Sequence, residues 1–288
     1  MRSYVPDYEL RVANRLDEAL SFLAAGEDWS PIAGGTDLMV LLNAGKLFHR
    51  RFVSIKSIPE LRTIEVSNDL ISIGAAVTYR QIREHPVLHG EFPLLCQAAS
   101  WTGGVANQNQ GTLGGNIVNA SPAADSAPPL LVHDARVRLI STAGERTVRY
   151  ADFHRGYKNL QMNASELLCK IELPRRRAGW KYFGRKVGTR RAQAISKCSI
   201  ALALELDSDV LAEVRLALGS VAPIPMRCVK TEEALRGKNL RAATIERACE
   251  ILRTEIAPID DIRSTAAYRA LVAENLLSNF LTNLYDAQ

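Results

Sequence analysis

The sequence predicts an α+β protein with two domains. Runs typical of strands and runs with helical spacing interleave through its first 175 residues. A linker is then indicated at Pro174 by the run of arginines that follows it, and two long apolar strands with three helical patterns close the chain. The expected domains span residues 1–175 and 178–288, and a hydrophobic content of 47% gives each domain material for a core.

The first domain is expected to mix short helices and strands. Apolar residues at helical spacing, between a candidate N-cap at Asn14 and a stop at Gly26, predict its first helix. The strands expected at 62–66 and 70–74 are separated by a tight turn, which indicates antiparallel pairing. The other expected elements are a strand at 30–33, a short helix from residue 38, a strand at 51–56, helices at 78–85 and 93–100, and strands at 136–141, 146–150 and 166–173.

Residues 102–129 interrupt this pattern. They are rich in glycine, proline and other turn formers and show little periodicity. A long irregular stretch inside a compact domain is uncommon unless it wraps a ligand. The second domain is more regular, with strands expected at 192–206 and 210–220 around a turn at 207–209, and helices near 231–236, 240–255 and 264–285.

Two glycine segments carry the functional signal. AGGTD (33–37) lies between an expected strand and helix, and TLGGN (112–116) continues into NASPAAD. A phosphate needs several backbone N–H groups pointing at it, and glycine allows the close approach and positive φ values that such a nest requires. Either segment alone could be an ordinary turn. Together, bordered by hydroxyl and amide side chains, they predict one ligand held from two sides.

Several function classes are disfavoured. The fingerprints GxGxxG, GxxxxGK[ST] and GxSxG are missing, and the five histidines and five cysteines show no metal-ligand spacing. The scattered cysteines fit a reducing cytosol, and no apolar run is long enough for membrane insertion. The net charge of +5 is spread without a nucleic-acid signature. The basic stretch 175–191 is expected to face solvent or a partner.

The segments PIAGGTDL (31–38) and GTLGGNIVNASPAADSAPPLL (111–131) resemble the flavoprotein subunits of the xanthine dehydrogenase and carbon monoxide dehydrogenase family. The resemblance extends over nearly the whole chain. It implies a two-part FAD-binding domain of the vanillyl-alcohol-oxidase-like (PCMH) type, followed by a C-terminal antiparallel sheet with three helices.

The resemblance also implies the residues that would hold FAD. Asp125 would accept hydrogen bonds from the ribose or adenine, although the same residue could form an Asx-turn or a helix N-cap. Lys197 would lie near the flavin ring and favour its anionic reduced form, or it could face solvent. The full cofactor set is Ile32, Ala33, Gly34, Gly35, Thr36, Asp37, Thr112, Gly114, Gly115, Asn116, Val118, Ala124, Asp125 and Lys197.

In such a family the chain is one part of a larger enzyme. The resemblance implies a large partner subunit with a molybdenum cofactor and a small partner with [2Fe–2S] clusters, assembled as a dimer of heterotrimers in the cytoplasm. FAD would pass the electrons to an external acceptor. Neither glycine segment contains His or Cys, so the FAD should be non-covalent. The alternatives are a stand-alone FAD-dependent oxidoreductase with its own substrate pocket and a scaffold that has lost FAD.

Overall fold

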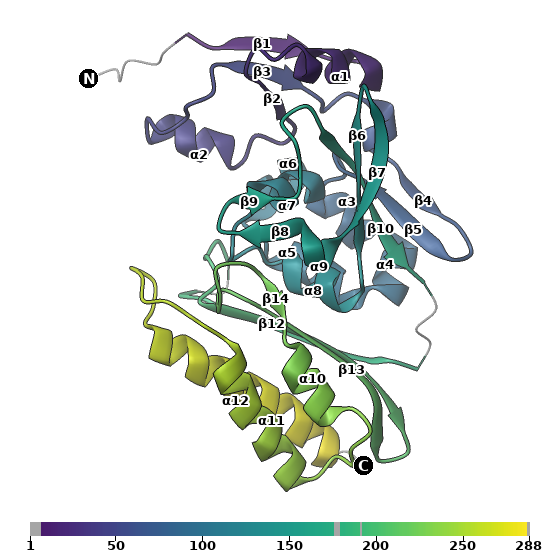
Figure 1. Ribbon diagram of the computed structural model, residues 1–288, viewed down its shortest axis with the longest axis vertical. Coiled ribbons are helices and arrows are strands. Elements are labelled where there is room, and N and C mark those ends of the chain that lie inside the picture. Colours follow the sequence, from purple (N-terminus) through teal and green to yellow (C-terminus); the bar gives the residue numbers. More distant parts are fainter. Residues whose placement is uncertain (1–6, 176–178, 191, 287–288) are drawn as a thin grey trace.

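Three layers of structure are stacked along the long axis of the molecule in the computed structural model, which describes residues 7–175, 179–190 and 192–286 (Figure 1). The top layer is a small parallel sheet of order β1-β3-β2, covered by α1. Its core contains Ala19, Leu20 and Val53. The elements are β1 (Glu9–Val12), α1 (Leu16–Ala24), β2 (Trp29–Ile32), α2 (Leu38–Asn43) and β3 (Arg51–Ser54).

The middle layer is an antiparallel sheet of order β4-β5-β10-β6-β7, flanked by short helices. Its strands are β4 (Ile64–Val66), β5 (Leu70–Gly74), β6 (Arg136–Ser141), β7 (Gly144–Arg149) and β10 (Leu167–Pro174), with a separate hairpin of β8 (His154–Gly156) and β9 (Asn159–Leu160). Its helices are η1 (Pro59–Leu61), α3 (Tyr79–Glu84), α4 (Pro86–Glu91), α5 (Pro93–Trp101), α6 (Val105–Gln110), α7 (Leu113–Asn119), α8 (Ala127–Val132) and α9 (Tyr150–Phe153).

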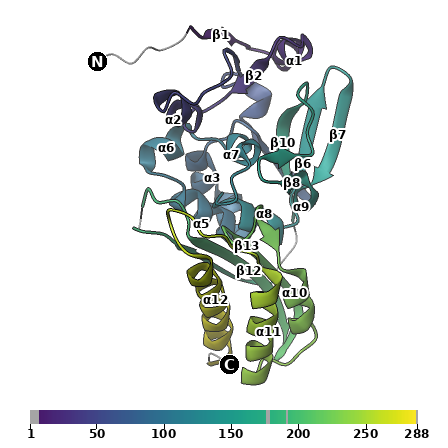
Figure 2. The ribbon, with the colours of Figure 1, turned by 60° about the vertical axis from the view of Figure 1, so that its left-hand side comes forward.

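The bottom layer is a four-stranded antiparallel sheet with three helices on its outer face (Figure 2). Its elements are β11 (Lys181–Val187), β12 (Cys198–Asp207), β13 (Val210–Gly219), β14 (Met226–Arg227), α10 (Val229–Leu235), α11 (Ala242–Glu255) and α12 (Ala266–Asp286). The predicted fold class is therefore confirmed. The predicted domain boundary lies between residue 175 and residue 178, and residues 176–178 are outside the described part of the chain.

The sequence of β12 explains how this sheet joins the layer above it. Successive side chains of a strand point to opposite faces. Ile200, Leu202 and Leu204 pack with the helices α10–α12, whereas Ala201 and Ala203 belong to the core of the middle layer. Large residues thus fill one face, and small residues on the other let the helices of the middle layer come close.

Three expectations about elements are wrong, and some strands were not expected. Residues 102–129 are not irregular, because they contain α6, α7 and the start of α8. The residue before α1 is Arg15 rather than Asn14, and neither the β1 strand nor the β11 strand was expected. The strand expected from residue 192 begins only at Cys198. β11 is an edge strand, where charged residues are common. Its two lysines and its arginine made the strand difficult to recognise in the sequence.

The described part of the chain contains no helix that combines the length and the hydrophobicity needed to cross a membrane.

Candidate functional site

The first glycine segment forms the turn between β2 and α2. Gly35 has a φ of +68°, a conformation that is costly for any residue with a Cβ. Within the described residues, the N–H groups of Gly34, Gly35, Thr36 and Asp37 make no hydrogen bond, although Gly34–Thr36 are half-buried. Partly buried N–H groups are rarely left unpaired in a folded protein. Three of them in a row, followed by the N–H of the exposed residue Asp37, indicate a site for an external acceptor.

The second segment lies directly against the first. A Cβ on Gly34 would overlap the carbonyl oxygen of Gln110 and lie 2.7 Å from its carbonyl carbon, so only glycine fits there. A Cβ on Gly111 would in turn lie 3.4 Å from the hydroxyl of Thr36. Lys56, just after β3, donates to the side chain of Gln110 at 2.6 Å. The structure thus brings together two segments that are far apart in the sequence.

The second segment is a helix start rather than a loop. Thr112 is the N-cap of α7, and its hydroxyl accepts a hydrogen bond from the N–H of Gly115 at 3.1 Å. Gly114 is buried, its N–H donates to the carbonyl of Ala75 at 3.0 Å, and a Cβ on it would lie 2.6 Å from that of Ala75. Gly114 therefore allows α7 to pack closely against the chain that follows β5. Gly115, in contrast, is exposed.

The other predicted residues of this region extend the packing inward. The hydroxyl of Ser126 donates to the side-chain oxygen of Asn116 at 2.6 Å, which ties α7 to the start of α8. Val118 and Ala124 contribute to the core of the middle layer. Ile32 ends β2, and Ala33 packs at the edge of the top layer's core.

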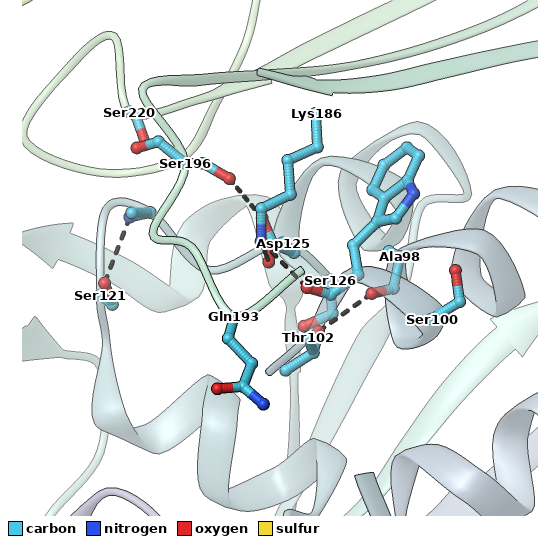
Figure 3. Close-up of polar contacts among 12 residues, drawn as sticks. Ala98, Ser100, Thr102, Ser121, Asp125, Ser126, Lys186, Gln193, Ser196 and Ser220 are labelled. Carbon is cyan, nitrogen blue, oxygen red and sulfur yellow. Dashed lines mark hydrogen bonds and ion pairs between the residues drawn. The ribbon is translucent and has the colours of Figure 1, made fainter. Parts of the chain in front are cut away.

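Asp125 lies where the middle and bottom layers meet (Figure 3). Its two carboxylate oxygens bind Lys186 of β11 and the hydroxyl of Ser196, each at 2.5 Å. The side chains of Asp125 and Lys186 are only 8% and 9% exposed, and Lys186 also donates to the carbonyl of Trp101 at 3.0 Å. Burial raises the pKa of Asp125, and the adjacent ammonium opposes that shift. We take the close ammonium to keep the carboxylate charged.

Lys197 follows this junction in the chain and is half-buried. The side-chain ammonium of Lys197 lies over the ring of Tyr268, 5.0 Å from the centroid. The main-chain N–H of Lys197 donates to the carbonyl of Val187. The loop before it reaches the middle layer, where a Cβ on Gly104 would lie 2.5 Å from the side-chain amide nitrogen of Gln193. The proximity of Lys197 to the flavin stays a prediction.

The sequence did not predict several features of the site and of the basic stretch. The basic stretch was expected to face solvent or a partner, but the side chain of Lys186 is only 9% exposed, and Arg175 pairs with Glu91 at 2.6 Å. Arg176, Arg177 and Arg191 lie outside the described residues. Gly111 could have been found, because it immediately precedes TLGGN. No local signal in the sequence marks Lys186.

Comparisons with known proteins agree with this geometry. Residues 6–176 match the family model described as the FAD binding domain in molybdopterin dehydrogenase, and residues 184–284 match that of the CO dehydrogenase flavoprotein C-terminal domain. The chain belongs to this family of FAD-binding subunits of molybdenum hydroxylases. The resemblance inferred from the sequence is therefore confirmed, and with it the assignment to the FAD-dependent oxidoreductases.

Relatives within the family match over almost their full lengths. A putative xanthine dehydrogenase FAD-binding subunit of Escherichia coli (strain K12) is 32% identical, over 96% of this chain and 95% of its own. The glyceraldehyde dehydrogenase medium chain of Sulfolobus acidocaldarius is also 32% identical, with 95% and 96% covered. Among solved structures, carbon monoxide dehydrogenase from Hydrogenophaga pseudoflava, lacking the Mo-pyranopterin moiety of its cofactor, superimposes with a TM-score of 0.92 at 25% identity, covering 96% of both chains.

Proposed function

We propose that this chain binds FAD non-covalently between the two glycine segments and relays electrons from [2Fe–2S] clusters of a small partner subunit to an external acceptor. A large partner subunit would hold the molybdenum cofactor, and the complex would be a dimer of heterotrimers in the cytoplasm. The relatives are named as medium chains or FAD-binding subunits, which supports a partnered role over a stand-alone oxidoreductase. All five cysteines are buried and unpaired, in keeping with a reducing compartment.

One observation carries the cofactor assignment, namely the row of unpaired N–H groups at Gly34–Asp37. FAD contains a diphosphate, whose oxygens accept hydrogen bonds from such a row. The row is braced by Gln110 and Gly111, so the donors are fixed before a ligand arrives. The residues present therefore fit the group that the family binds.

The chain's own residues would divide the work of binding. The N–H groups of the first segment would hold the diphosphate, with Ile32 and Ala33 shaping the wall beside it. Thr112, Gly114 and Asn116 would fix α7 at the correct distance, and Gly115 and Val118 would border the cofactor. The bound group would supply redox chemistry that can match one-electron donors to a two-electron acceptor. Ala124, Asp125 and Lys197 stay candidates for contacts with its other parts.

A pair of glycine variants tests the placement of the cofactor. Gly35 and Gly45 share a positive φ, of +68° and +66°, and a Cβ on Gly45 would meet nothing within 4 Å. Gly35→Val and Gly45→Val therefore impose similar backbone strain. We expect Gly35→Val to purify without flavin absorbance and Gly45→Val to keep the wild-type flavin content. Equal flavin content in both variants would remove the first segment from the site.

Purification from the native host tests the partners. We expect a chain with cysteine clusters and a much larger chain to co-purify, and the yellow colour to leave the protein on acid precipitation. An isolated chain that oxidises an organic substrate unaided would instead establish the stand-alone oxidoreductase. Colour retained in the precipitate would show covalent FAD.

A further inference from the structure

Lys158 occupies the turn of the β8–β9 hairpin in an unusual conformation. Its φ is +56°, in the left-handed region that glycine adopts freely and lysine does not. The hairpin lies beside α7 in Figure 1, and the ring of His154 is 3.3 Å from the carbonyl oxygen of Ile117. A strained residue persists only where its surroundings hold it, and such residues cluster at functional sites.

The side chain of Lys158, an exposed residue, ends at the last residue of α7 and within electrostatic range of Asp37. Its ammonium donates to the carbonyl oxygen and, at 2.7 Å, to the side-chain oxygen of Asn119, the last residue of α7. Partial desolvation of the ammonium lowers the pKa of Lys158, and the nearby negative charge of Asp37, which ends the first segment, opposes the shift. An ammonium has three N–H donors. Both of the acceptors described for it belong to Asn119, so one donor is left over.

Three other lysines of the region make contacts with other residues of the chain. Lys56 donates to Gln110, and Lys197 lies over Tyr268. Lys186 is buried against Asp125. Lys158 is thus a cation that the fold holds at the end of α7 and near Asp37, the last residue of the first glycine segment.

We propose that Lys158 is a cofactor-binding cation, held by Asn119 so that its remaining N–H meets a negative group of bound FAD. That group is either the diphosphate or the flavin ring, which gains negative charge on reduction. The inference rests on the proposed position of FAD at the two segments. It explains why a lysine stands where glycine would cost less backbone strain.

The test measures two properties of purified Lys158→Gln, namely the FAD affinity of its apo-protein by fluorescence quenching and the reduction potential of its bound flavin. A charge-assisted contact to the diphosphate predicts FAD binding weakened by about tenfold or more. A contact to the ring predicts nearly unchanged affinity and a lower potential. Lys158→Arg should restore most of either effect, and Arg155→Gln, which removes an exposed cation from the same hairpin, should change neither property.

Lys158→Gly separates the cofactor role from folding. Glycine accepts the left-handed backbone, so the melting temperature of the apo-protein should be no lower than that of Lys158→Gln. The loss in affinity or potential should nevertheless equal that of Lys158→Gln. Wild-type affinity and potential in both variants would show that Lys158 merely fastens the hairpin to α7, as would a defect that arginine does not rescue. If wild-type protein itself retains no FAD, the proposed function fails instead.

Discussion

Replacing Asp125 with alanine is expected to destabilise the cofactor-free protein by about 3–5 kcal/mol, the usual cost of removing one partner of a buried ion pair. Lys186 is 9% exposed and would keep only the carbonyl of Trp101 as an acceptor. Ser196 would lose its acceptor as well. The magnitude thus arises mainly from a charge left buried without its counter-charge.

Urea unfolding of the apo-protein, followed by circular dichroism, measures this cost. Lys186→Met should also destabilise the protein, and the double variant should be more stable than the sum of the two losses predicts, by about 1–3 kcal/mol. Glu84→Ala gives the matched control, because it breaks an exposed ion pair. The side chain of Glu84 is 62% exposed, and that of its partner Arg80 is 59% exposed. Its expected cost is below about 1 kcal/mol.

The same variants separate two roles of Asp125. If the carboxylate mainly joins the layers, Asp125→Ala is unstable even without FAD. If it mainly binds ribose or adenine, the apo-protein unfolds at the wild-type urea concentration while FAD affinity falls. That second result, or additive losses in the double variant, would refute the reasoning.

Three further predictions concern single positions. Gly34→Ala should cost about 3 kcal/mol in the free energy of unfolding because its Cβ would overlap main chain, whereas Gly90→Ala, with nothing within 4 Å, should be neutral or slightly stabilising in urea titrations. Burial raises the pKa of Asp261, but hydrogen bonds from the main chain and from Arg269 lower it by a larger amount, so the pKa is about 2. Its contribution is therefore full above the unfolded pKa of 3.8 and is lost as the pH falls toward 2. Because Asp261 is an exposed residue, solvent screens its contacts, and Asp261→Asn should cost only about 1 kcal/mol at pH 6 and progressively less at pH 3 and below. Thr112→Val should cost about 1 kcal/mol of thermal stability by removing the N-cap of α7, and an unchanged melting temperature would contradict that role.

The elements that the sequence predicted well are those with strong local signals. The hairpin of β4 and β5 follows from two apolar runs around a turn, and α3 begins at Thr78 with the capping box that Gln81 completes. The helices α6 and α7 have six and seven residues, too few for a helical period to be recognised against their glycines and amides. Short helices of this kind are stabilised by their tertiary contacts rather than by their own sequence.

The sequence predicted that the two glycine segments lie together, but not the contacts that shape them. Glycine in both segments was attributed to contact with a ligand, yet Gly34 and Gly114 are required by contact with other main chain, and Gly35 by its positive φ. Sequence alone cannot separate these causes, because each requires a missing Cβ. Lys158 and Lys186 bind Asn119 and Asp125, which are 39 and 61 residues away in the sequence. No pattern in the sequence near either lysine predicts its partner.

These contacts explain how the four N–H groups are held in one row without an acceptor from the described part of the chain. An isolated glycine turn would relax until its donors reached a neighbouring carbonyl. Here Gly34 is fixed against Gln110, and α7, which follows Gln110 closely in the chain, is itself held by Ala75, Ser126 and Lys158. The donors lose their conformational entropy during folding. Binding of a diphosphate therefore does not have to order them, and its affinity is not reduced by that entropy loss. A variant that loosens α7 should therefore weaken FAD binding even where it touches no atom of the cofactor.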